Sequence, residues 1–464
     1  MAELRVETTA IPGLLVVHLP VLSDHRGWFK ENWQRENMVG LGLPDFAPVQ
    51  NNVAYNLRRG ATRGIHAEPW DKLVSVVTGR IFGSWVELRA GQPVGRVVTL
   101  EMGPETAVFV PRGVGNSYQT LEDATSYSYL VNDHWSPAAR DSYTFVNLAD
   151  PSLAIPWPIP LQDADISEAD RAHPALTDGE PVPALRPLVL GAGGQVGREL
   201  SAVLPHAHCV TKADLDLTAP GLEDALDWGR YDVLYNTAAY TAVDHAETPE
   251  GRREAWAVNV EGTARLVEVA RRHRLPLVHF SSDYVFDGTE ERHREDEALS
   301  PLGVYGQTKA AADALVATLP HHYIVRTSWV IGDGDNFVST MARLAEQEAS
   351  PSVVCDQVGR LSFAGELARA ARHLVTERAA SGTYNVTCAG EVASWADIAA
   401  EVFRAAGRDP KDVNRVTSAE YSAGKQLAPR PQHSTLRLEK IEATGFRPVS
   451  MAAALATFLE ALPK

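Results

Sequence analysis

The chain has 464 residues and a mass of 50.4 kDa, which predicts two or three domains. Hydrophobic residues make up 45% of the chain and charged residues 22%, a composition that excludes a largely disordered protein. The 59 acidic and 43 basic residues give a formal net charge of -16. This charge would repel a phosphate backbone, so nucleic acid is not an expected partner.

The cysteines and the first residues of the chain favour a cytoplasmic protein. Cys209, Cys355 and Cys388 are too few and too widely spaced for a disulfide framework or a CxxC metal site. No apolar run approaches the ~18 residues of a membrane span, and the first ten residues lack the basic and apolar regions of a signal peptide. We therefore expect a soluble cytoplasmic chain that binds no membrane.

Residues 13 to 150 contain short apolar runs, many of them β-branched or aromatic, separated by turn-forming residues. These runs predict at least six strands, at residues 13–22, 72–77, 81–88, 97–102, 107–110 and 126–131. No long stretch of this region has helical periodicity, so we expect an all-β barrel or a cupin-like jelly roll. The proline-rich residues 151–187 then predict an extended arm and a linker.

The pattern changes near residue 184, where we place the boundary between a first domain at 1–184 and a second at 185–464. Strands and helices then alternate, in segments at 187–190, 198–204, 233–236, 252–273, 277–280, 308–318 and 323–327. This alternation predicts an α/β Rossmann-type fold, a doubly wound parallel sheet, with a smaller C-terminal substrate-binding region.

A glycine-rich turn at residues 191–197 follows the first strand of the second domain and precedes its first helix. Such a turn lets the backbone approach a pyrophosphate at the helix N-terminus, although glycines alone can also mark only a tight turn. Asp214 and Asp216 follow near the end of the expected second strand, where a ribose or adenine would be contacted. Lys212, close by, favours NADPH over NADH, while the two aspartates favour NADH.

Residues 305–309 read Tyr-Gly-Gln-Thr-Lys, and Ser282 stands at the end of an expected strand before them. The YxxxK spacing places Tyr305 and Lys309 on one face of a helix. The lysine ammonium can then lower the pKa of the phenol, which gives a proton to a carbonyl oxygen as hydride arrives at the carbon. The alternative is a helix with a solvated lysine and no chemistry.

At these residues the second half resembles the extended short-chain dehydrogenase/reductase superfamily and, more closely, the dTDP-4-dehydrorhamnose reductase family. The similar stretches lie at 236–244, 281–288, 326–329, 336–337, 356–359 and 430–431. The resemblance implies a catalytic trio of Ser282, Tyr305 and Lys309, with Trp329 lining the sugar-nucleotide site. The family usually has Thr at Ser282 and Pro-Thr at Leu361-Ser362, and neither difference removes a catalytic group.

The expected cofactor site combines the glycine turn, the end of the second strand, the loop after the third strand and the catalytic helix. Its residues are Gly191, Gly194, Gln195, Val196, Gly197, Asp216, Leu217, Ala238, Ala239, Tyr240, Tyr305 and Lys309.

Residues 5 to 175 resemble the dTDP-4-dehydrorhamnose 3,5-epimerase family of cupin-like jelly rolls. The similar stretches lie at 24–31, 50–52, 63–66, 72–74 and 76–79. The resemblance implies that His66 is the base, Lys72 the cation that holds the enolate oxygen, and Tyr129 the acid on the opposite face. It also implies that Asp170 orients His66. The positions that match the nucleotide-sugar site are Arg26, Glu31, Gln50, Asn52, Arg63 and Trp135.

Three positions of the first half differ from that family. Asn116 stands where the family has a second histidine, Gly83 where it has the aspartate of that histidine, and Trp135 where it has a second tyrosine. The second His–Asp dyad is therefore expected to be absent. His66-Ala67-Glu68 is similar to the start of a metal cupin motif, but Asn116 removes the later histidine, so we assign no metal.

The two resemblances together imply a bifunctional enzyme: the first domain epimerises C3 and C5 of dTDP-4-dehydro-6-deoxy-D-glucose, and the second reduces C4 with NADPH, with NADH as the alternative. A homo-oligomer is expected, as a dimer through the cupin-like domain. A second hypothesis is a reductase whose jelly roll only binds sugar nucleotide or mediates assembly. A third is a non-catalytic regulatory protein that binds a nucleotide.

Overall fold

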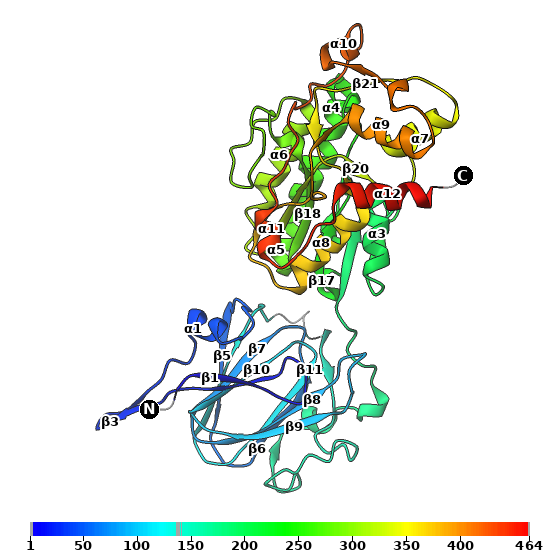
Figure 1. Cartoon of the computed structure of the whole chain (residues 1–464). Helices are drawn as coiled ribbons and strands as arrows, with labels where there is room; N and C mark the ends of the chain where they lie inside the picture. The colour runs from blue at the N-terminus through cyan, green and yellow to red at the C-terminus, as the bar shows by residue number, and fades with distance from the viewer. Residues whose placement is uncertain (1–2, 136–139, 141, 463–464) are drawn as a thin grey trace. The chain divides into compact units, whose positions relative to one another are not determined.

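The computed structural model describes residues 3–135, 140 and 142–462, and it divides into two compact units, residues 1–184 and 185–464. Each unit has its own hydrophobic core, and the two are described separately below (Figure 1). Within the described ranges, no helix has the length and apolar character needed to cross a bilayer.

The first unit is built from two six-stranded sheets that pack face to face. The first sheet has the order β1 (Arg5–Thr8), β2 (Leu15–His18), β10 (Thr106–Val110), β7 (Lys72–Thr78), β12 (Thr125–Val131) and β5 (Gln50–Asn56). The second has the order β13 (Thr144–Phe145), β6 (Ala61–Ala67), β11 (Val114–Thr120), β8 (Ile81–Glu87) and β9 (Val97–Met102), with β14 (Asp165–Ile166) beside β6. All pairings except β14 with β6 are antiparallel, which confirms the predicted all-β jelly roll.

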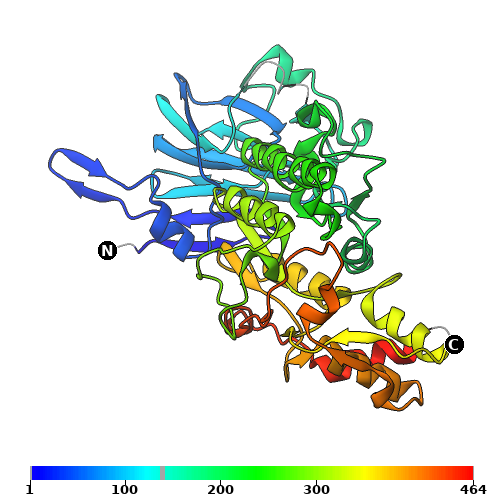
Figure 2. The ribbon, with the colours of Figure 1, turned by 90° about the horizontal axis from the view of Figure 1, so that it is seen from above.

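The core of this sandwich consists of side chains from the inner faces of both sheets. Val74 and Val76 of β7 meet Trp85 of β8 and Tyr118 of β11 there. The outer face of the first sheet is covered by α1 (Arg35–Gly40), whose Met38 is fully buried. A hairpin of β3 (Leu22–Asp24) and β4 (Gly27–Phe29) projects from this unit (Figures 1 and 2).

The proline-rich arm packs against the outer face of the second sheet rather than running free to its end. Leu153 is buried there beside Ile65, and Trp157, Leu176 and Val182 pack on the same cluster. The arm contains β14, the short helix α2 (Glu168–Arg171) and the 3₁₀ turn η2 (Leu176–Asp178). The part expected to be a linker is therefore structured to about Val182.

The second unit contains a six-stranded sheet in which every pairing is parallel. Its order is β16 (His208–Val210), β15 (Arg186–Leu190), β17 (Tyr231–Asn236), β18 (Leu277–Ser282), β19 (His322–Thr327) and β24 (Gly382–Asn385). The predicted doubly wound parallel sheet is confirmed.

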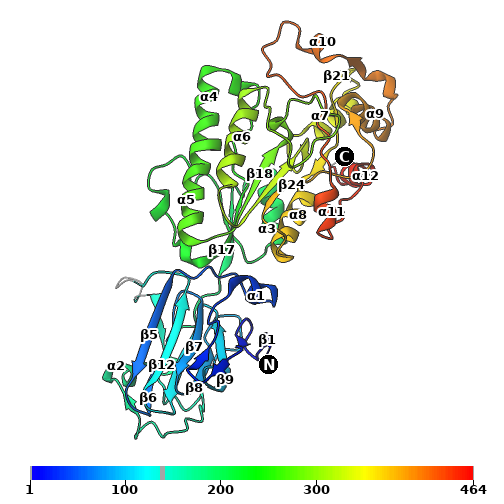
Figure 3. The same ribbon diagram turned by 90° about the vertical axis from the view of Figure 1, so that its left-hand side faces the viewer.

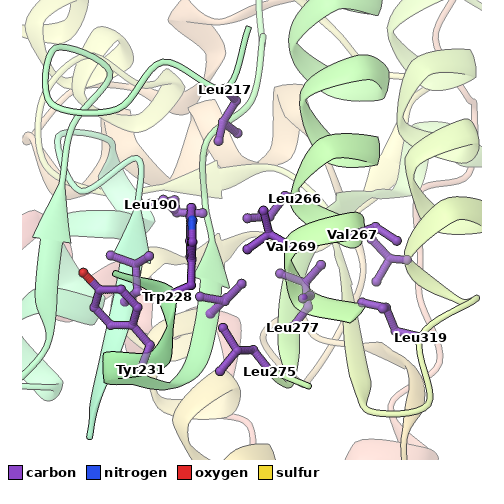
Figure 4. Packing of buried hydrophobic residues seen from close by; sticks show 14 of the residues in the cluster. Leu190, Leu217, Trp228, Tyr231, Leu266, Val267, Val269, Leu275, Leu277 and Leu319 are labelled. Atoms are coloured by element: carbon purple, nitrogen blue, oxygen red, sulfur yellow. The ribbon is translucent and has the colours of Figure 1, made fainter. Parts of the chain in front are cut away.

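Alternate residues of each strand pack on opposite faces of this sheet, as strand geometry requires. Leu188 and Leu190 face the helices α5 (Thr263–His273) and α6 (Val304–Val316), where Figure 4 shows Leu266 and Leu277 in the same cluster. Val189 faces the other way, toward α3 (Gln195–Val203) and α8 (Ala364–Thr376). Figure 3 shows the two helix layers on either side of the sheet.

A smaller region surrounds its own cluster, which includes Met341, Phe363 and Phe403. Its helices are α7 (Phe337–Glu346), α9 (Trp395–Ala405), α10 (Ser418–Ser422) and α12 (Met451–Ala461), whereas α11 (Glu439–Ala443) packs through Ile441 on the core of the parallel sheet. Its short strand pairs are β20 (Val330–Ile331) with β23 (Ser362–Phe363), β21 (Ser352–Val354) with β26 (Asn414–Val416), and β22 (Val358–Gly359) with β25 (Ala393–Ser394).

The helix predicted at residues 252–273 contains a change of helical geometry. Its parts are α4 (Pro249–Trp256), a π-helical segment η6 (Ala257–Gly262) and α5. Asn259 in η6 directs its side chain to the backbone of Tyr240 and to Thr308 Oγ1. A π-helical turn often lies at a functional site, and this one lies beside the loop after β17.

Candidate functional site

In the glycine turn, the backbone of Gly191 lies very close to Gly197 in the first turn of α3. Gly191 has a left-handed φ of +77°, and a Cβ on Gly197 would lie 2.3 Å from the carbonyl oxygen of Gly191. Gly194 caps α3, and no side chain in the described structure supplies that cap with a hydrogen bond. The first N–H groups of α3 are therefore available to an anionic ligand.

Replacing Gly197 with alanine is expected to abolish cofactor binding, because the added methyl group forces the Gly191 carbonyl out of the turn. A matched control is Gly193→Ala, whose Cβ would meet only Thr211 Cγ2, at 3.8 Å. The measurement is NADPH titration by fluorescence, with melting temperature as a check of folding. Equal affinity in the two variants would contradict the role of the turn.

The acidic residues of the expected ribose site lie in the loop after β16 rather than at its end, because that strand stops at Val210. Asp214 accepts hydrogen bonds from the backbone and hydroxyl of Thr211, and Asp216 accepts them from Thr218. The hydrogen bond from the Thr218 side chain is the main cause that lowers the pKa of Asp216 below its usual value. Leu217, predicted to bind cofactor, buries its side chain in the core, so only its backbone faces the loop.

The loop after β17 is held at both of its ends. The Ala238 N–H donates to Asn236 Oδ1 at 3.2 Å. The Tyr240 N–H donates to Asn259 Oδ1 at 2.8 Å, and Asn259 Nδ2 donates back to the Tyr240 carbonyl. Two amide side chains thus fix the conformation of residues 238–240, the predicted cofactor loop.

Ser282, Tyr305 and Lys309 come together where β18 ends against α6. Burial and nearby Asp283 raise the pKa of Tyr305 above its usual value, and a hydrogen bond with Ser282 opposes this rise. Burial lowers the pKa of Lys309 to about 8, and its Nζ donates to the Phe280 carbonyl at 2.6 Å. The pKa of the phenol is therefore raised, and the lowering expected from Lys309 is not seen. The phenol is held protonated, which is the state that a general acid requires.

Two further groups at this site were not predicted. Asp283 is buried next to Ser282, whose hydroxyl donates to it at 3.1 Å, and burial raises the pKa of Asp283 to about 6. Arg430 pairs with Asp244 at 2.9 Å. This pair joins two stretches that are 186 positions apart, so sequence spacing gives no signal for it.

The Trp329 ring stacks on Trp395 with centroids 3.9 Å apart, and Phe337 packs against Trp395. The backbone of Trp329 has a φ of 47°, an uncommon conformation for a bulky residue that is often found at ligand sites. Gly359 lies beneath this ring, because a Cβ there would be 3.1 Å from Trp329 Cζ2. Trp329 is therefore part of a partly buried aromatic cluster with Trp395 and Phe337.

In the first unit, His66 and Asp170 form the predicted pair. His66 Nε2 lies 3.0 Å from Asp170 Oδ1, although the residues are 104 positions apart. Burial would raise the pKa of Asp170, but the hydrogen bond and charge of His66 outweigh burial and lower it below the usual value. The ionised carboxylate can thus orient the imidazole and stabilise its protonated form.

Lys72 and Tyr129 face the same interior. The Lys72 ammonium is buried and pairs with Glu68 at 2.9 Å. Tyr129 stands opposite Asn52 in the pairing of β12 with β5. Burial raises the pKa of Tyr129, as does the charge of Glu68, so the phenol is held protonated. Glu68 was not predicted as part of this site.

The structure also accounts for the missing second dyad. Asn116 lies directly opposite His66 in the pairing of β11 with β6, and its Oδ1 accepts from the Tyr127 hydroxyl at 3.3 Å. The ring of Trp85 covers Gly83, where a Cβ would lie 2.5 Å from that ring. Asn116, where the family has the second histidine, thus makes a hydrogen bond between uncharged groups. The Trp85 ring fills the space beside Gly83, where the family has the aspartate.

The predicted nucleotide-sugar residues divide into two groups. Gln50 donates to Asn52 at 2.8 Å and accepts from the Trp135 backbone, while Arg63 donates to Asn56 at 3.3 Å. These side chains lie on or beside the sandwich strands.

Arg26 and Glu31 are exposed at the projecting hairpin and its base, and Arg26 pairs with Asp24 in its own turn. Within one chain, these two residues are not gathered with His66.

His173 adjoins the His66–Asp170 pair and was also not predicted. Its Nε2 lies 3.7 Å from Asp170 Oδ1, and its ring stacks on Phe145. Ligand atoms of His66, Asp170 and His173 lie within 4.8 Å of one another. That no metal binds here stays a prediction. The same arrangement of His66, Asp170 and His173 also suits a histidine base that is hydrogen-bonded to a carboxylate.

Both units match known protein families. Residues 185–463 match the family described as RmlD substrate binding domain, and residues 8–178 match the family described as dTDP-4-dehydrorhamnose 3,5-epimerase. Over 181 residues the chain is 48% identical to a protein of Streptococcus pyogenes serotype M6 named Protein RmlC homolog, an alignment that covers 38% of this chain and 91% of that relative.

The second unit has similar relatives of its own. Over 291 residues the chain is 38% identical to the dTDP-4-dehydrorhamnose reductase of Aggregatibacter actinomycetemcomitans, covering 58% of this chain and 97% of that protein. The structure is also similar to the crystal structure of a dTDP-4-dehydrorhamnose reductase from Bacillus anthracis in complex with NADP. That likeness has a TM-score of 0.56 and 30% identity, and it covers 60% of this chain and 100% of the other.

Proposed function

We propose a bifunctional enzyme for this chain, which belongs to the RmlD substrate binding domain family over residues 185–463 and to the dTDP-4-dehydrorhamnose 3,5-epimerase family over residues 8–178. The first unit inverts C3 and C5 of dTDP-4-dehydro-6-deoxy-D-glucose, and the second reduces C4 to give dTDP-L-rhamnose. The observation that carries this proposal is one chain holding both the His66–Asp170 pair and the Ser282–Tyr305–Lys309 trio.

In the epimerase, His66 removes the proton beside the C4 ketone. The buried Lys72 ammonium is the group that would stabilise the enolate oxygen, and Tyr129 returns a proton on the opposite face. The pairing of Lys72 with Glu68 holds the ammonium in place within the sandwich. Gln50, Asn52 and Arg63 are proposed to hold the sugar nucleotide, with Trp135 in the loop after β12. Arg26 and Glu31 are proposed to contact the sugar nucleotide of a partner chain from the projecting hairpin and its base.

The second unit fits a dinucleotide. The close approach of Gly197 to Gly191 and the uncapped start of α3 leave room and N–H donors for a pyrophosphate. The proposed binding residues are Gly191, Gly194, Gln195, Val196 and Gly197 of the glycine turn, Asp216, the backbone of Leu217, residues 238–240, Tyr305 and Lys309. When bound, the nicotinamide supplies hydride to C4. Tyr305 gives its proton to the C4 oxygen, Ser282 hydrogen-bonds that oxygen, and Trp329 lines the sugar site.

The order of the two reactions follows from their chemistry. Epimerisation through an enolate is reversible and leaves a mixture, whereas reduction removes the ketone that makes the neighbouring C–H groups acidic. Reduction therefore fixes the new stereocentres. A single chain supplies the two activities in equal amounts.

NADPH is the cofactor, and Lys212 is proposed to select it over NADH. Its Nζ lies 3.9 Å from Asp216 Oδ2, and 79% of its side chain is exposed, so it can reach a 2′-phosphate beside the ribose. Lys212→Ala is expected to raise KM for NADPH about tenfold while leaving KM for NADH unchanged. Steady-state kinetics with both cofactors checks this. An unchanged ratio of kcat/KM values would exclude Lys212 as the selecting residue.

A homo-oligomer formed through the first unit is proposed from the projecting hairpin. Leu22, Trp28 and Phe29 there expose 50%, 42% and 63% of their surface, and apolar groups of this size favour a partner surface. Trp28→Ser combined with Phe29→Ser is expected to convert a dimer into a monomer by light scattering. Val392→Ser, at an exposed apolar residue of the second unit, is the control. A dimer that persists in the double variant would contradict the proposal.

A cytoplasmic location is also proposed. The three cysteines are unpaired, as is usual in a reducing compartment, and nucleotide sugars and NADPH are cytoplasmic metabolites.

A further inference from the structure

A line of buried polar side chains connects Lys309 of α6 to the cofactor loop through His279 and Asn236, two residues that take no part in the mechanism above. Lys309 Nζ lies 3.3 Å from His279 Nε2, and His279 Nδ1 lies 3.1 Å from Asn236 Nδ2. Asn236 Oδ1 in turn accepts from the Ala238 N–H. Asn236 and His279 are each 1% exposed, so water does not replace these partners.

The Ala238 N–H determines which group of each side chain donates a hydrogen bond and which accepts one. Because the Ala238 N–H needs an acceptor, Asn236 turns Oδ1 toward it and Nδ2 toward His279. An amide Nδ2 can only donate, so His279 Nδ1 must accept and carries no proton. Burial, and after it the charge of Lys309, holds the pKa of His279 well below its usual value, so the ring is neutral. The single ring proton therefore lies on Nε2.

Lys309 consequently faces an N–H donor. The amine form of Lys309 can accept this hydrogen, while still donating to the Phe280 carbonyl. The ammonium form can only donate, so it needs the other histidine tautomer. That tautomer requires Asn236 to turn its oxygen to His279 and to release the Ala238 N–H. Protonation of Lys309 is thus linked to the hydrogen bond that holds the cofactor loop.

The other charged groups around Lys309 cannot take the place of His279 in coupling its protonation to the cofactor loop. Asp313, on the same helix, is paired with Arg326 of β19 at 2.9 Å. Asp283 lies toward Tyr305 and raises the pKa of that phenol. The η6 segment presents the uncharged Asn259 to Thr308. His279 is therefore the contact of the Lys309 amino group that can change between donor and acceptor.

We infer that Asn236 and His279 form a tautomer relay that couples the protonation state of Lys309 to the cofactor loop at Ala238. They are positioning residues, and the inference rests on the proposed reductase function. An anionic cofactor binds better to the ammonium form of Lys309, so affinity for NADPH falls as this group loses its proton. In the wild-type chain we expect that fall to have a midpoint near pH 8, where the pKa of Lys309 lies.

Two variants should each stabilise the ammonium form of Lys309, by different means. In Asn236→Asp, the carboxylate can accept from both Ala238 and His279 Nδ1, which leaves Nε2 free to accept from the ammonium. In His279→Gln, the amide oxygen can face the ammonium without any buried negative charge. Each should raise the midpoint by about one pH unit or more, the scale of a hydrogen bond to a charged group. NADPH binding is measured by fluorescence from pH 6 to 10, with melting temperatures for both variants.

The controls separate the relay from a simple charge effect. Asn385→Asp places a carboxylate at a fully buried position of the same sheet and should leave the midpoint unchanged. In Asn236→Asp combined with His279→Leu, the upward shift should be lost, because no ring transmits it. Unchanged midpoints in both single variants, or a shift that survives His279→Leu, would overturn the relay. A wild-type chain that binds NADPH but reduces no 4-keto sugar would contradict the proposed function and leave this binding test valid.

Discussion

Tyr305→Phe is expected to lower the rate of NADPH-dependent reduction by about 10²–10⁴-fold, the usual effect of removing a positioned general acid. The reason is that burial keeps the Tyr305 proton on the phenol until it is transferred, and phenylalanine has no proton to give. Affinity for NADPH should stay near that of the wild type, since the pyrophosphate is held by the glycine turn. Single-turnover oxidation of NADPH with the 4-keto sugar measures the effect.

Two further readouts support this assignment. Deuterium exchange at C3 and C5 of the substrate should be unchanged in Tyr305→Phe, because the first unit has its own base. Tyr284→Phe removes a second hydroxyl, from a ring 5.8 Å away, and should reduce turnover far less. Near-normal turnover in Tyr305→Phe would remove this residue from the mechanism.

His66→Ala is expected to stop the exchange of the C3 and C5 protons with solvent, again by about 10²–10⁴-fold. The loss should be complete in practice, because Asn116 is bonded to Tyr127 and Trp85 covers Gly83, so no second dyad can substitute. The variant should form no dTDP-L-rhamnose from the 4-keto glucose precursor. Proton NMR in deuterium oxide follows both changes.

The reductase should be unaffected by this variant, since the two units have separate cores. Given sugar already processed by another epimerase, His66→Ala should oxidise NADPH as fast as the wild type. His18→Ala, at a histidine of the same unit that pairs with Glu7 on the surface, is the control and should keep exchange. Loss of reduction in His66→Ala would show that the two units are coupled.

The fold could be predicted where apolar residues alternate or cluster. The runs at 72–77 and 81–88 became β7 and β8, whose side chains fill the sandwich core. Strands β5, β6 and β11 were not predicted. Their inner faces carry polar groups such as Asn52, His66 and Asn116, which line the site and break the apolar pattern. These three missed strands therefore line the site, while β7 and β12, which carry Lys72 and Tyr129, were predicted.

The site was predictable where short motifs hold the chemistry. The YxxxK spacing places Tyr305 and Lys309 on α6 as expected. His279 and Asn259 were missed, because a single polar residue within a strand or helix gives no local signal until its partners are known. The contact of His66 with Asp170 could be expected only from family resemblance, since spacing alone does not join residues so far apart.

The most direct test of the bifunctional enzyme is NMR of the whole protein with dTDP-4-dehydro-6-deoxy-D-glucose in deuterium oxide, with and without NADPH. Without NADPH, we expect deuterium at C3 and C5. With NADPH, we expect dTDP-L-rhamnose that carries deuterium at both positions. A reduced sugar that retains its original protons and configuration at C3 and C5 would contradict this account, and would leave the jelly roll as a binding or assembly module.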